Sequence, residues 1–318
     1  MKKLLLSAAM LLFLVSCDKE EASVNDTTSG AKLTERGCAS HQVLEEQLRN
    51  DPSLAIRMNE IEEFTQNAVL QNRLVNGKIE IPVVVNVLYR TTAENISLAQ
   101  IQSQIDVLNK DFNATNSDFG SVPALFSGVK ANVGISFVLD VVNRKSTTKT
   151  SWGTNDAMKK TAQGGLNPTS PTTKLNLWVC TIGGGILGYA QFPGGSSATD
   201  GVVIDSKYLG TTGTATAPFN KGRTATHEVG HWMNLRHIWG DATCGNDLVA
   251  DTPTHNAPNY GVPAYPHYST CSGTPVEMTM NYMDYVDDAA MYMFSNGQKS
   301  RMLATFASGG PRNSFAQP

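Results

Sequence analysis

The residues of this chain that could do chemistry concentrate in residues 227–237, HEVGHWMNLRH, which hold three of its six histidines. His227 and His231 are four residues apart, so on a helix both imidazoles project from one face and can bind one Zn²⁺. Glu228 follows the first histidine directly and is placed to take a proton from an attacking water rather than to bind the metal. His237 comes six residues after His231, so the helix must end between them if a third nitrogen is to reach the metal.

Asn234 is the candidate residue for that turn. Asparagine adopts a positive φ more readily than other non-glycine residues, so it can end the helix and reverse the chain. Three protein ligands leave a fourth position open, which is typical of a catalytic zinc rather than a structural one. The stretch therefore predicts a zinc centre at which water attacks a carbonyl group at neutral pH.

The same stretch resembles the metzincin signature HExxHxxGxxH, which is followed downstream by a Met-turn. The chain departs from it at Asn234, where metzincins usually carry glycine. Three further motifs make the chain similar to the pappalysin family, and best to its small ulilysin-like and cytophagalysin-like members: WGD at 239–241, ADTP at 250–253 and MNYMDYVDD at 280–288. The resemblance runs from about Ile79 to about Leu303. It implies a zinc-dependent endopeptidase.

The Met-turn places two more residues. Met283 is expected to form an apolar floor beneath the three imidazoles and not to bind the metal. The alternative is an ordinary core methionine, whose packing would differ little from that role. Tyr285 resembles the tyrosine that some metzincins place near the zinc, where its hydroxyl donates to the developing oxyanion of the attacked carbonyl. The alternative for Tyr285 is a plain packing role.

Acidic residues suggest two further sites. Asp241, Asp247, Asp251 and Thr252 gather hard oxygen ligands in a loop that suits Ca²⁺, and small pappalysin relatives depend on calcium; the alternative is a solvated acidic loop. After the Met-turn come Asp284, Asp287 and Asp288, in a segment that forms the pocket for the residue after the scissile bond in metzincins. Asp287 and Asp288 would favour Arg or Lys there, and the sequence does not indicate which aspartate points inward.

Four cysteines follow Cys17, and they allow three pairings in the oxidising compartment that is expected. Cys244 and Cys271 flank a polar, turn-rich region that a disulfide would hold, and the family resemblance points to the same pair. Cys180 ends an apolar strand, so a buried free thiol is expected. Cys38 resembles the cysteine switch of metzincin zymogens, in which a thiol takes the open zinc position. A disulfide with Cys180 or an idle thiol are the alternatives.

The N-terminus reads as a targeting segment. A basic start and a short apolar run, residues 4–15, lead to a lipobox-like sequence that ends at Cys17, the expected lipidation site. An ordinary secretory signal is the alternative. We expect a signal peptide at 1–16, a tether and pro-segment at 17–73, a catalytic subdomain at 74–237 and a C-terminal subdomain at 238–318. This predicts an exported bacterial protein, an outer-membrane or cell-surface lipoprotein that is released when the pro-segment is cut before Arg57 or after Arg73.

Composition agrees with a globular protein. The chain has 318 residues, 41% hydrophobic and 17% charged, with a formal net charge of −3. This is enough for a substantial core, and it gives no indication of nucleic-acid binding. The lipid anchor is the only membrane contact expected, and the sequence does not indicate an oligomeric state.

Patterning predicts the elements that must position the site. Helices are expected at His41–Arg49, Ser53–Asn72, Ser97–Asn113, Lys221–Arg236 and Ser295–Ala307. Strands are expected at Lys78–Tyr89, Gly134–Val142, Lys174–Cys180, Gly188–Pro193 and Asp200–Ser206. Residues 238–293 show little periodicity. The fold class is α/β (α+β) of the metzincin type: a twisted mixed sheet with two helices above it and an irregular C-terminal lobe that ends in a helix.

The function that follows is a zinc endopeptidase whose peptide substrate pairs with an exposed strand, Leu187–Pro193, by main-chain hydrogen bonds. One alternative is a zincin in which Glu277 is the third ligand and His237 is structural. The other is a surface lipoprotein that binds a partner through a zinc-containing module without proteolysis.

Overall fold

The structure is a computed structural model that describes residues 33–71 and 79–316. In chain order its longer elements are α1 Ser40–Asn50, α2 Ser53–Leu70, β1 Ile79–Tyr89, α3 Leu98–Phe112, β2 Ile135–Ser146, β3 Leu175–Cys180, β4 Gly188–Ala190, β5 Val202–Asp205, α4 Arg223–Trp232 and α5 Asn296–Phe306. Short 3₁₀ turns, which the sequence did not predict, lie at Phe119–Ser121, Ala124–Phe126, Ala157–Lys159, Thr161–Gln163, Ser197–Thr199 and Asn313–Phe315.

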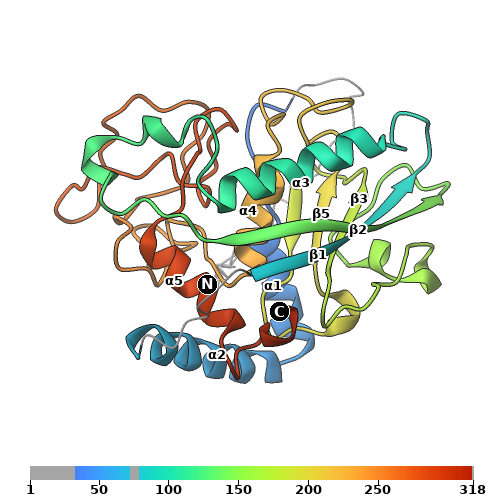
Figure 1. The fold of residues 1–318 in the computed structure, drawn as a ribbon, viewed down its shortest axis with the longest axis horizontal. Coiled ribbons are helices and arrows are strands. Elements are labelled where there is room, and N and C mark those ends of the chain that lie inside the picture. The colour runs from blue at the N-terminus through green and yellow to red at the C-terminus, as the bar shows by residue number, and fades with distance from the viewer. Residues whose placement is uncertain (1–32, 72–78, 317–318) are drawn as a thin grey trace, which may run out of the picture. The chain divides into compact units, whose positions relative to one another are not determined.

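A five-stranded sheet in the order β2-β1-β3-β5-β4 forms the centre of the fold. Four strands are parallel, and β4 pairs antiparallel with β5 at one edge, so the predicted mixed α/β architecture is confirmed. Helix α3 packs on β2, α4 packs on β4 and β5, and the two helices touch each other, which places both on one face (Figure 1). Every residue of α4 is buried, so the sheet and its neighbours fix the helix firmly.

Most predicted boundaries hold within a few residues. Ser97 caps α3 by accepting a hydrogen bond from the Gln100 amide, and Ser295 begins α5 with a reciprocal capping box. The helix predicted over Lys221–Arg236 is shorter than expected, because α4 ends at Trp232 just before the turn. Strand β4 pairs only to Ala190 rather than to Pro193.

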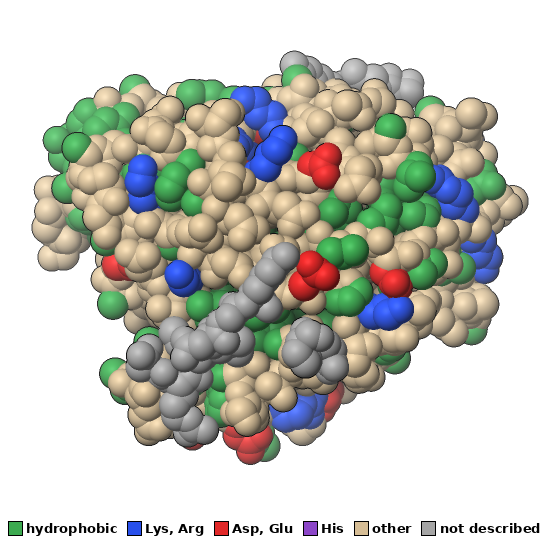
Figure 2. Space-filling model, in the orientation of Figure 1, with side chains coloured by type: hydrophobic (Ala, Val, Ile, Leu, Met, Phe, Trp, Pro, Cys, Tyr) green, Lys and Arg blue, Asp and Glu red, His purple; other side chains and the backbone are tan. Residues whose placement is uncertain are grey.

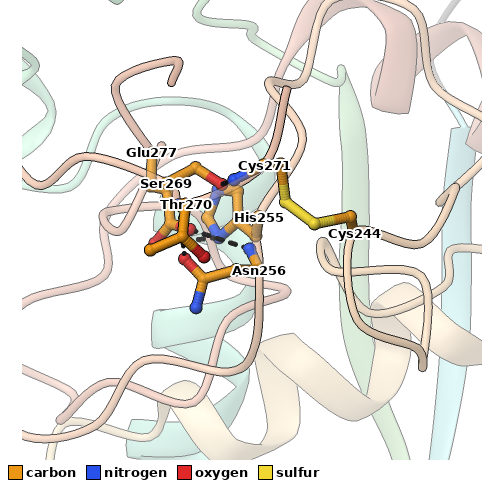
Figure 3. The surroundings of a disulfide bond; sticks show 7 residues. All are labelled: Cys244, His255, Asn256, Ser269, Thr270, Cys271 and Glu277. Atoms are coloured by element: carbon orange, nitrogen blue, oxygen red, sulfur yellow. Dashed lines mark hydrogen bonds and ion pairs between the residues drawn. A yellow bond between two sulfur atoms is a disulfide. The ribbon is translucent and has the colours of Figure 1, made fainter. Parts of the chain in front are cut away.

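Residues 238–293 contain no helix or strand, as predicted, and are held together by other means. The disulfide Cys244–Cys271 closes the lobe, which confirms that pairing (Figure 3). Beside it, the Asn256 amide donates to Glu277 and the Thr270 amide donates to the Asn256 side chain. Cys180 is a buried free thiol, as expected, and because Cys38 is free too, the alternative disulfide between these two is wrong.

Helices α1 and α2 precede the sheet and pack against the part of the chain that carries the histidines. Helix α1 touches β4, and α2 lies along α5. The signal peptide, Cys17, the tether and Arg73 fall on residues 1–32 and 72–78, outside the described part of the chain.

Charged side chains are dispersed on the face shown in Figure 2, where the described residues form no broad basic area of the kind that nucleic acid requires. None of the helices described is both long and apolar enough to cross a membrane.

Candidate metal centre

Three imidazoles converge on one point. His231 Nε2 lies 3.1 Å from His227 Nε2 and 3.1 Å from His237 Nε2. Helix α4 provides the first two rings from one face, and the turn after the helix brings in the third. Glu277, the alternative third ligand, instead binds Asn256 and Asn259 in the disulfide-closed lobe, so that alternative is wrong.

The hydrogen-bond partner of each Nδ1 atom determines the tautomer of its ring and therefore whether Nε2 is free to bind a metal. His227 Nδ1 lies 2.7 Å from the Tyr282 carbonyl and His231 Nδ1 lies 2.7 Å from the Leu235 carbonyl. A carbonyl oxygen only accepts, so both Nδ1 atoms carry the proton. His237 Nδ1 contacts a carboxylate oxygen of Asp241. This is the usual arrangement for histidines whose Nε2 lone pairs face a metal.

The same geometry shows that a cation fits there. Burial, followed by the charges of the neighbouring histidines, lowers the pKa of His227 well below its usual range, and burial lowers the pKa of His231 to about 3. The rings of these two residues are therefore neutral, and their Nε2 lone pairs point at each other at 3.1 Å with no proton between them. A divalent ion placed among the nitrogens turns this repulsion into coordination, and three imidazoles are a donor set that zinc prefers.

The turn between the second and third histidines is held from the far end of the chain. Asn234 has φ +73°, as predicted. The guanidinium of Arg301 donates from Nε to the Asn234 carbonyl at 2.7 Å, and that of Arg312 donates from Nε to the Trp232 carbonyl at 2.6 Å. Both arginines are buried, so they satisfy carbonyls that the helix end leaves without partners. Neither contact was predicted, because each joins residues that are far apart along the chain.

Met283 packs against α4 at Gly230, between the two histidines of the helix in sequence, and its role as a floor beneath the rings stays a prediction. Its peptide oxygen accepts from the Ile238 amide, one residue after His237. Its sulfur lies so close to Gly230 that a Cβ at that position would be 2.5 Å from it. Glycine between His227 and His231 is therefore needed for the close approach of the thioether to α4.

Glu228 faces the space beside the metal centre and is 1% exposed. Burial raises the pKa of its carboxyl to about 7, while hydrogen bonds from Ser40 and Cys38 and the charge of Arg36 oppose the shift. Ser40 Oγ donates to Glu228 Oε2 at 2.8 Å and accepts from the Ala190 amide at 2.8 Å. Ser40 was missed by sequence reasoning, which considered only the thiol two residues earlier.

Cys38 completes the group of metal-binding atoms. Its sulfur and one ring nitrogen from each of His227, His231 and His237 lie within 4.8 Å of one another, all buried. The segment that carries it lies along β4: the Leu187 amide donates to the Gly37 carbonyl, and the Ala39 amide donates to the Gly188 carbonyl. This pairing is parallel to β4 and uses the edge strand predicted for substrates.

Tyr285 lies over the same centre. Its ring centroid is 4.9 Å from that of His237 and 5.7 Å from that of His227. Its hydroxyl donates to the Cys38 carbonyl at 3.2 Å. Burial, together with the nearby Cys38 and Glu228, raises the pKa of this phenol well above its ordinary value, so the hydroxyl remains a donor at neutral pH.

Arg36 enters a buried pocket that ends at Asp288. Its guanidinium donates to Asp288 Oδ1 at 2.6 Å, to the Val286 carbonyl at 3.2 Å and to Thr224 Oγ1 at 3.1 Å. The ring of Phe219 stacks on it, with 5.0 Å between the guanidinium carbon and the ring centroid. Both charged groups are fully enclosed.

The other two aspartates after the Met-turn are placed differently from Asp288. Asp287 is half-buried and its amide donates to the Gly261 carbonyl. Asp284 accepts from the amides of Asn259 and Tyr285. Of the three, Asp288 is the aspartate that contacts Arg36.

The four predicted calcium ligands make hydrogen bonds or contacts with different partners. Asp241 contacts His237, and Asp251 accepts from the Ser295 hydroxyl and the Gly297 amide at the start of α5. Asp247 and Thr252 hydrogen-bond to each other. Among the described residues, the histidine and cysteine group is the one cluster of at least three ligating side chains with metal-binding geometry.

Known proteins resemble the chain along most of its length. The family model Peptidase_M43, described as pregnancy-associated plasma protein-A, matches residues 179–307. An extracellular metalloprotease of Pyricularia oryzae is 32% identical over 86% of this chain and 89% of its own, and one of Colletotrichum graminicola is 31% identical over 90% and 95%.

Two solved structures from Tannerella forsythia are also similar. Mature mirolysin in complex with a cleaved peptide is 42% identical, with a TM-score of 0.73, over 76% of this chain and 97% of its own. A variant of promirolysin is 40% identical, with a TM-score of 0.81, over 88% and 97%.

Proposed function

The chain belongs to the pappalysin family and is a zinc metalloendopeptidase, and from that premise we propose how its own residues divide the work. His227, His231 and His237 hold the zinc, and Glu228 is the general base. The observation that carries this proposal is the set of three converging Nε2 atoms with a buried carboxylate beside them. Membership of a protease family favours catalysis over the zinc-containing binding module considered above.

When bound, zinc supplies a Lewis acid that makes water nucleophilic at neutral pH and polarises the scissile carbonyl. Glu228 takes the proton of the attacking water and passes it to the leaving amine, for which a carboxyl of raised pKa is suited. Tyr285 donates its hydroxyl proton in a hydrogen bond to the oxyanion, as it now donates to the Cys38 carbonyl. Strand β4 aligns the substrate by main-chain pairing, in the place that residues 37–39 now occupy.

We propose that the enzyme prefers Arg or Lys directly after the scissile bond, and that Asp288 sets this preference. The support is Arg36, whose guanidinium fills a closed pocket next to the metal centre and donates to that carboxylate. The guanidinium of Arg36 uses three nitrogens here, on the Asp288 carboxylate, the Val286 carbonyl and the Thr224 hydroxyl, and it lies against the ring of Phe219, a set of partners that suits arginine better than lysine.

We further propose that the described residues 33–71 belong to a pro-segment that keeps the enzyme latent. Cys38 presents a sulfur to the metal centre, Ser40 donates to Glu228, and Arg36 fills the specificity pocket. Mature mirolysin matches 76% of this chain and the promirolysin variant matches 88%, and the additional match is about the length of these residues. In this proposal the pro-segment ends near residue 73, and residue 237 separates the catalytic subdomain from the C-terminal subdomain.

Latency should depend on both Cys38 and Ser40. Replacing Cys38 with alanine, written Cys38→Ala, should raise the activity of the unprocessed chain toward a quenched peptide by at least tenfold, and Ser40→Ala should do so by a few-fold. The reason is that Cys38→Ala removes the sulfur proposed to occupy the metal centre, whereas Ser40→Ala removes one buried hydrogen bond to Glu228, worth about 1–2 kcal/mol. Activity is measured before any cleavage is visible on a gel. Ser53→Ala, on the exposed side of α2, is the control, and unchanged latency in Cys38→Ala would refute the switch.

Export is supported by the extracellular relatives, and we propose that Cys17 carries a lipid that anchors the protein to the cell surface until the pro-segment is cut. Mass spectrometry of the N-terminal peptide from the native host tests this, because an unmodified or absent Cys17 in the membrane fraction would contradict it.

We propose calcium only for the loop around Asp247. Burial raises the pKa of its carboxyl to about 6, a cost that a bound cation would remove. Adding millimolar Ca²⁺ to chelator-treated, zinc-reloaded protein should then raise its Tm by several degrees, and Asp247→Asn should abolish the shift. An equal Tm with and without calcium would show that the loop needs no ion.

A further inference from the structure

Arg301 holds a glutamate of the proposed pro-segment in a two-point contact. Its two terminal nitrogens donate to the two carboxylate oxygens of Glu62 on α2, at 2.8 Å for the Nη1 contact. Its third nitrogen, Nε, is occupied by the Asn234 carbonyl. The Asn234 carbonyl, in the catalytic part of the chain, therefore fixes the guanidinium plane. The two terminal nitrogens of Arg301 point toward the pro-segment.

A second arginine acts on the same carboxylate. The charge of Arg236 contributes to lowering the pKa of Glu62, although burial opposes the shift and the hydrogen bonds of Arg301 lower it more. Arg236 and Arg301 both line a cavity of about 350 Å³ between the pro-segment helices and the turn after α4. The catalytic wall of that cavity also includes Phe192 and Asn234, which places it next to the metal centre.

The position of the cavity relative to the metal centre indicates which substrate residues would bind in the cavity. Arg36 lies in the pocket proposed for the residue after the scissile bond, and Cys38 lies at the metal. The pro-segment then continues past Ala190 toward Phe192 and α5, on the opposite side of the metal from that pocket. Substrate residues before the scissile bond must therefore pass this side.

Within the part of the chain that the structure describes, the two other carboxylates considered near Arg301 already have partners of their own. The nearby carboxylate of Asp241 is engaged by His237. Asp247, whose pKa Arg301 also influences, accepts hydrogen bonds from Thr252 and the Val249 amide. Once α2 has left, Asn234 still orients the guanidinium of Arg301, and its two terminal nitrogens have lost the Glu62 oxygens that accepted from them.

We infer that Arg301, with Arg236, forms a subsite in the mature enzyme for an acidic side chain located a few residues before the scissile bond, and that Glu62 occupies it in the latent chain. The inference rests on the proposed function, in which α2 leaves on activation. Preorganisation supports it, because a guanidinium held by Nε loses little side-chain entropy when it binds a carboxylate in bidentate fashion.

The test uses the full chain after activation and zinc loading, with peptides that carry one arginine after the scissile bond. Glu is compared with its neutral isostere Gln at each of the second to sixth positions before that bond, and the readout is the ratio of kcat/KM values for each pair. We expect Glu to be preferred roughly tenfold at one position or at two adjacent ones, with a smaller preference at 1 M salt.

Variants then locate the subsite. In Arg301→Gln, whose amide can still donate to the Asn234 carbonyl, and in Arg236→Gln, the ratio at the preferred position should fall to within about twofold of one. Arg90→Gln, an exposed arginine at the end of β1, should keep the full preference. Because each ratio is taken within one variant, a general loss of activity cancels.

Two failures are distinguishable. Equal rates for Glu and Gln at all five positions, with intact cleavage before arginine, would overturn the acidic subsite and leave the protease assignment standing. A preference that survives in both Arg301→Gln and Arg236→Gln would also overturn it. Zinc-loaded, processed protein that cuts no peptide would overturn the proposed function and this inference together.

Discussion

Glu228→Ala is expected to lower kcat toward a peptide by about 10²–10⁴-fold while one zinc remains bound per chain. The carboxylate lies beside the imidazoles, hydrogen-bonds to Ser40 and makes no contact that holds the rings. Removing it therefore removes proton transfer and leaves the three nitrogens in place. The measurement combines zinc analysis with kinetics on protein processed by an added protease, since the variant should not process itself.

The matched control for this prediction is Glu277→Ala, which removes the other glutamate near the end of the chain. Glu277 lies in the disulfide-closed lobe, so its loss should change stability more than the chemical step. Substantial turnover by purified Glu228→Ala with a full zinc content would show that another group acts as the base.

Asp288→Asn should lower kcat/KM for peptides with arginine after the scissile bond by about 10²–10³-fold, because a buried guanidinium would lose its charged acceptor. Peptides with a neutral residue at that position should lose much less. Asparagine keeps a carbonyl oxygen that can accept from the Lys221 amide, which limits damage to the start of α4.

Asp287→Asn is the control for specificity, since it removes the same charge one residue away on a half-buried side chain. If Asp287→Asn lost the arginine preference and Asp288→Asn kept it, the pocket would be assigned to the wrong aspartate. Asp288→Asn should also weaken latency, because Arg36 would lose the same partner.

The sequence predicted the parts of this centre that are local. Two histidines one helical turn apart, an asparagine able to take a positive φ and the caps Ser97 and Ser295 are all encoded within a few residues. The strands were found because their apolar runs are long, and the family resemblance added the Met-turn. The ends of α4 and β4 were misplaced, because pairing and chain reversal decide them rather than hydrophobic periodicity.

The missed or undecided parts depend on contacts across the chain. Arg36 meets Asp288 across 252 positions, and Arg301 meets Glu62 across 239. No spacing rule connects such pairs, so the sequence could offer Asp287 and Asp288 only as equals. Ser40 was overlooked for the same reason, since its role depends on a fold that brings it against Glu228.

The two arginines that hold the turn after α4 come from the last 18 residues of the chain, at positions 301 and 312. A ribosome makes these residues last, and an exported chain that leads with its N-terminus would deliver them last. Cys38, which we propose to be inhibitory, is made more than 250 residues earlier. On the latency proposal, each newly made molecule carries its inhibitory segment before Arg301 and Arg312, which support the turn to the third histidine, have been made.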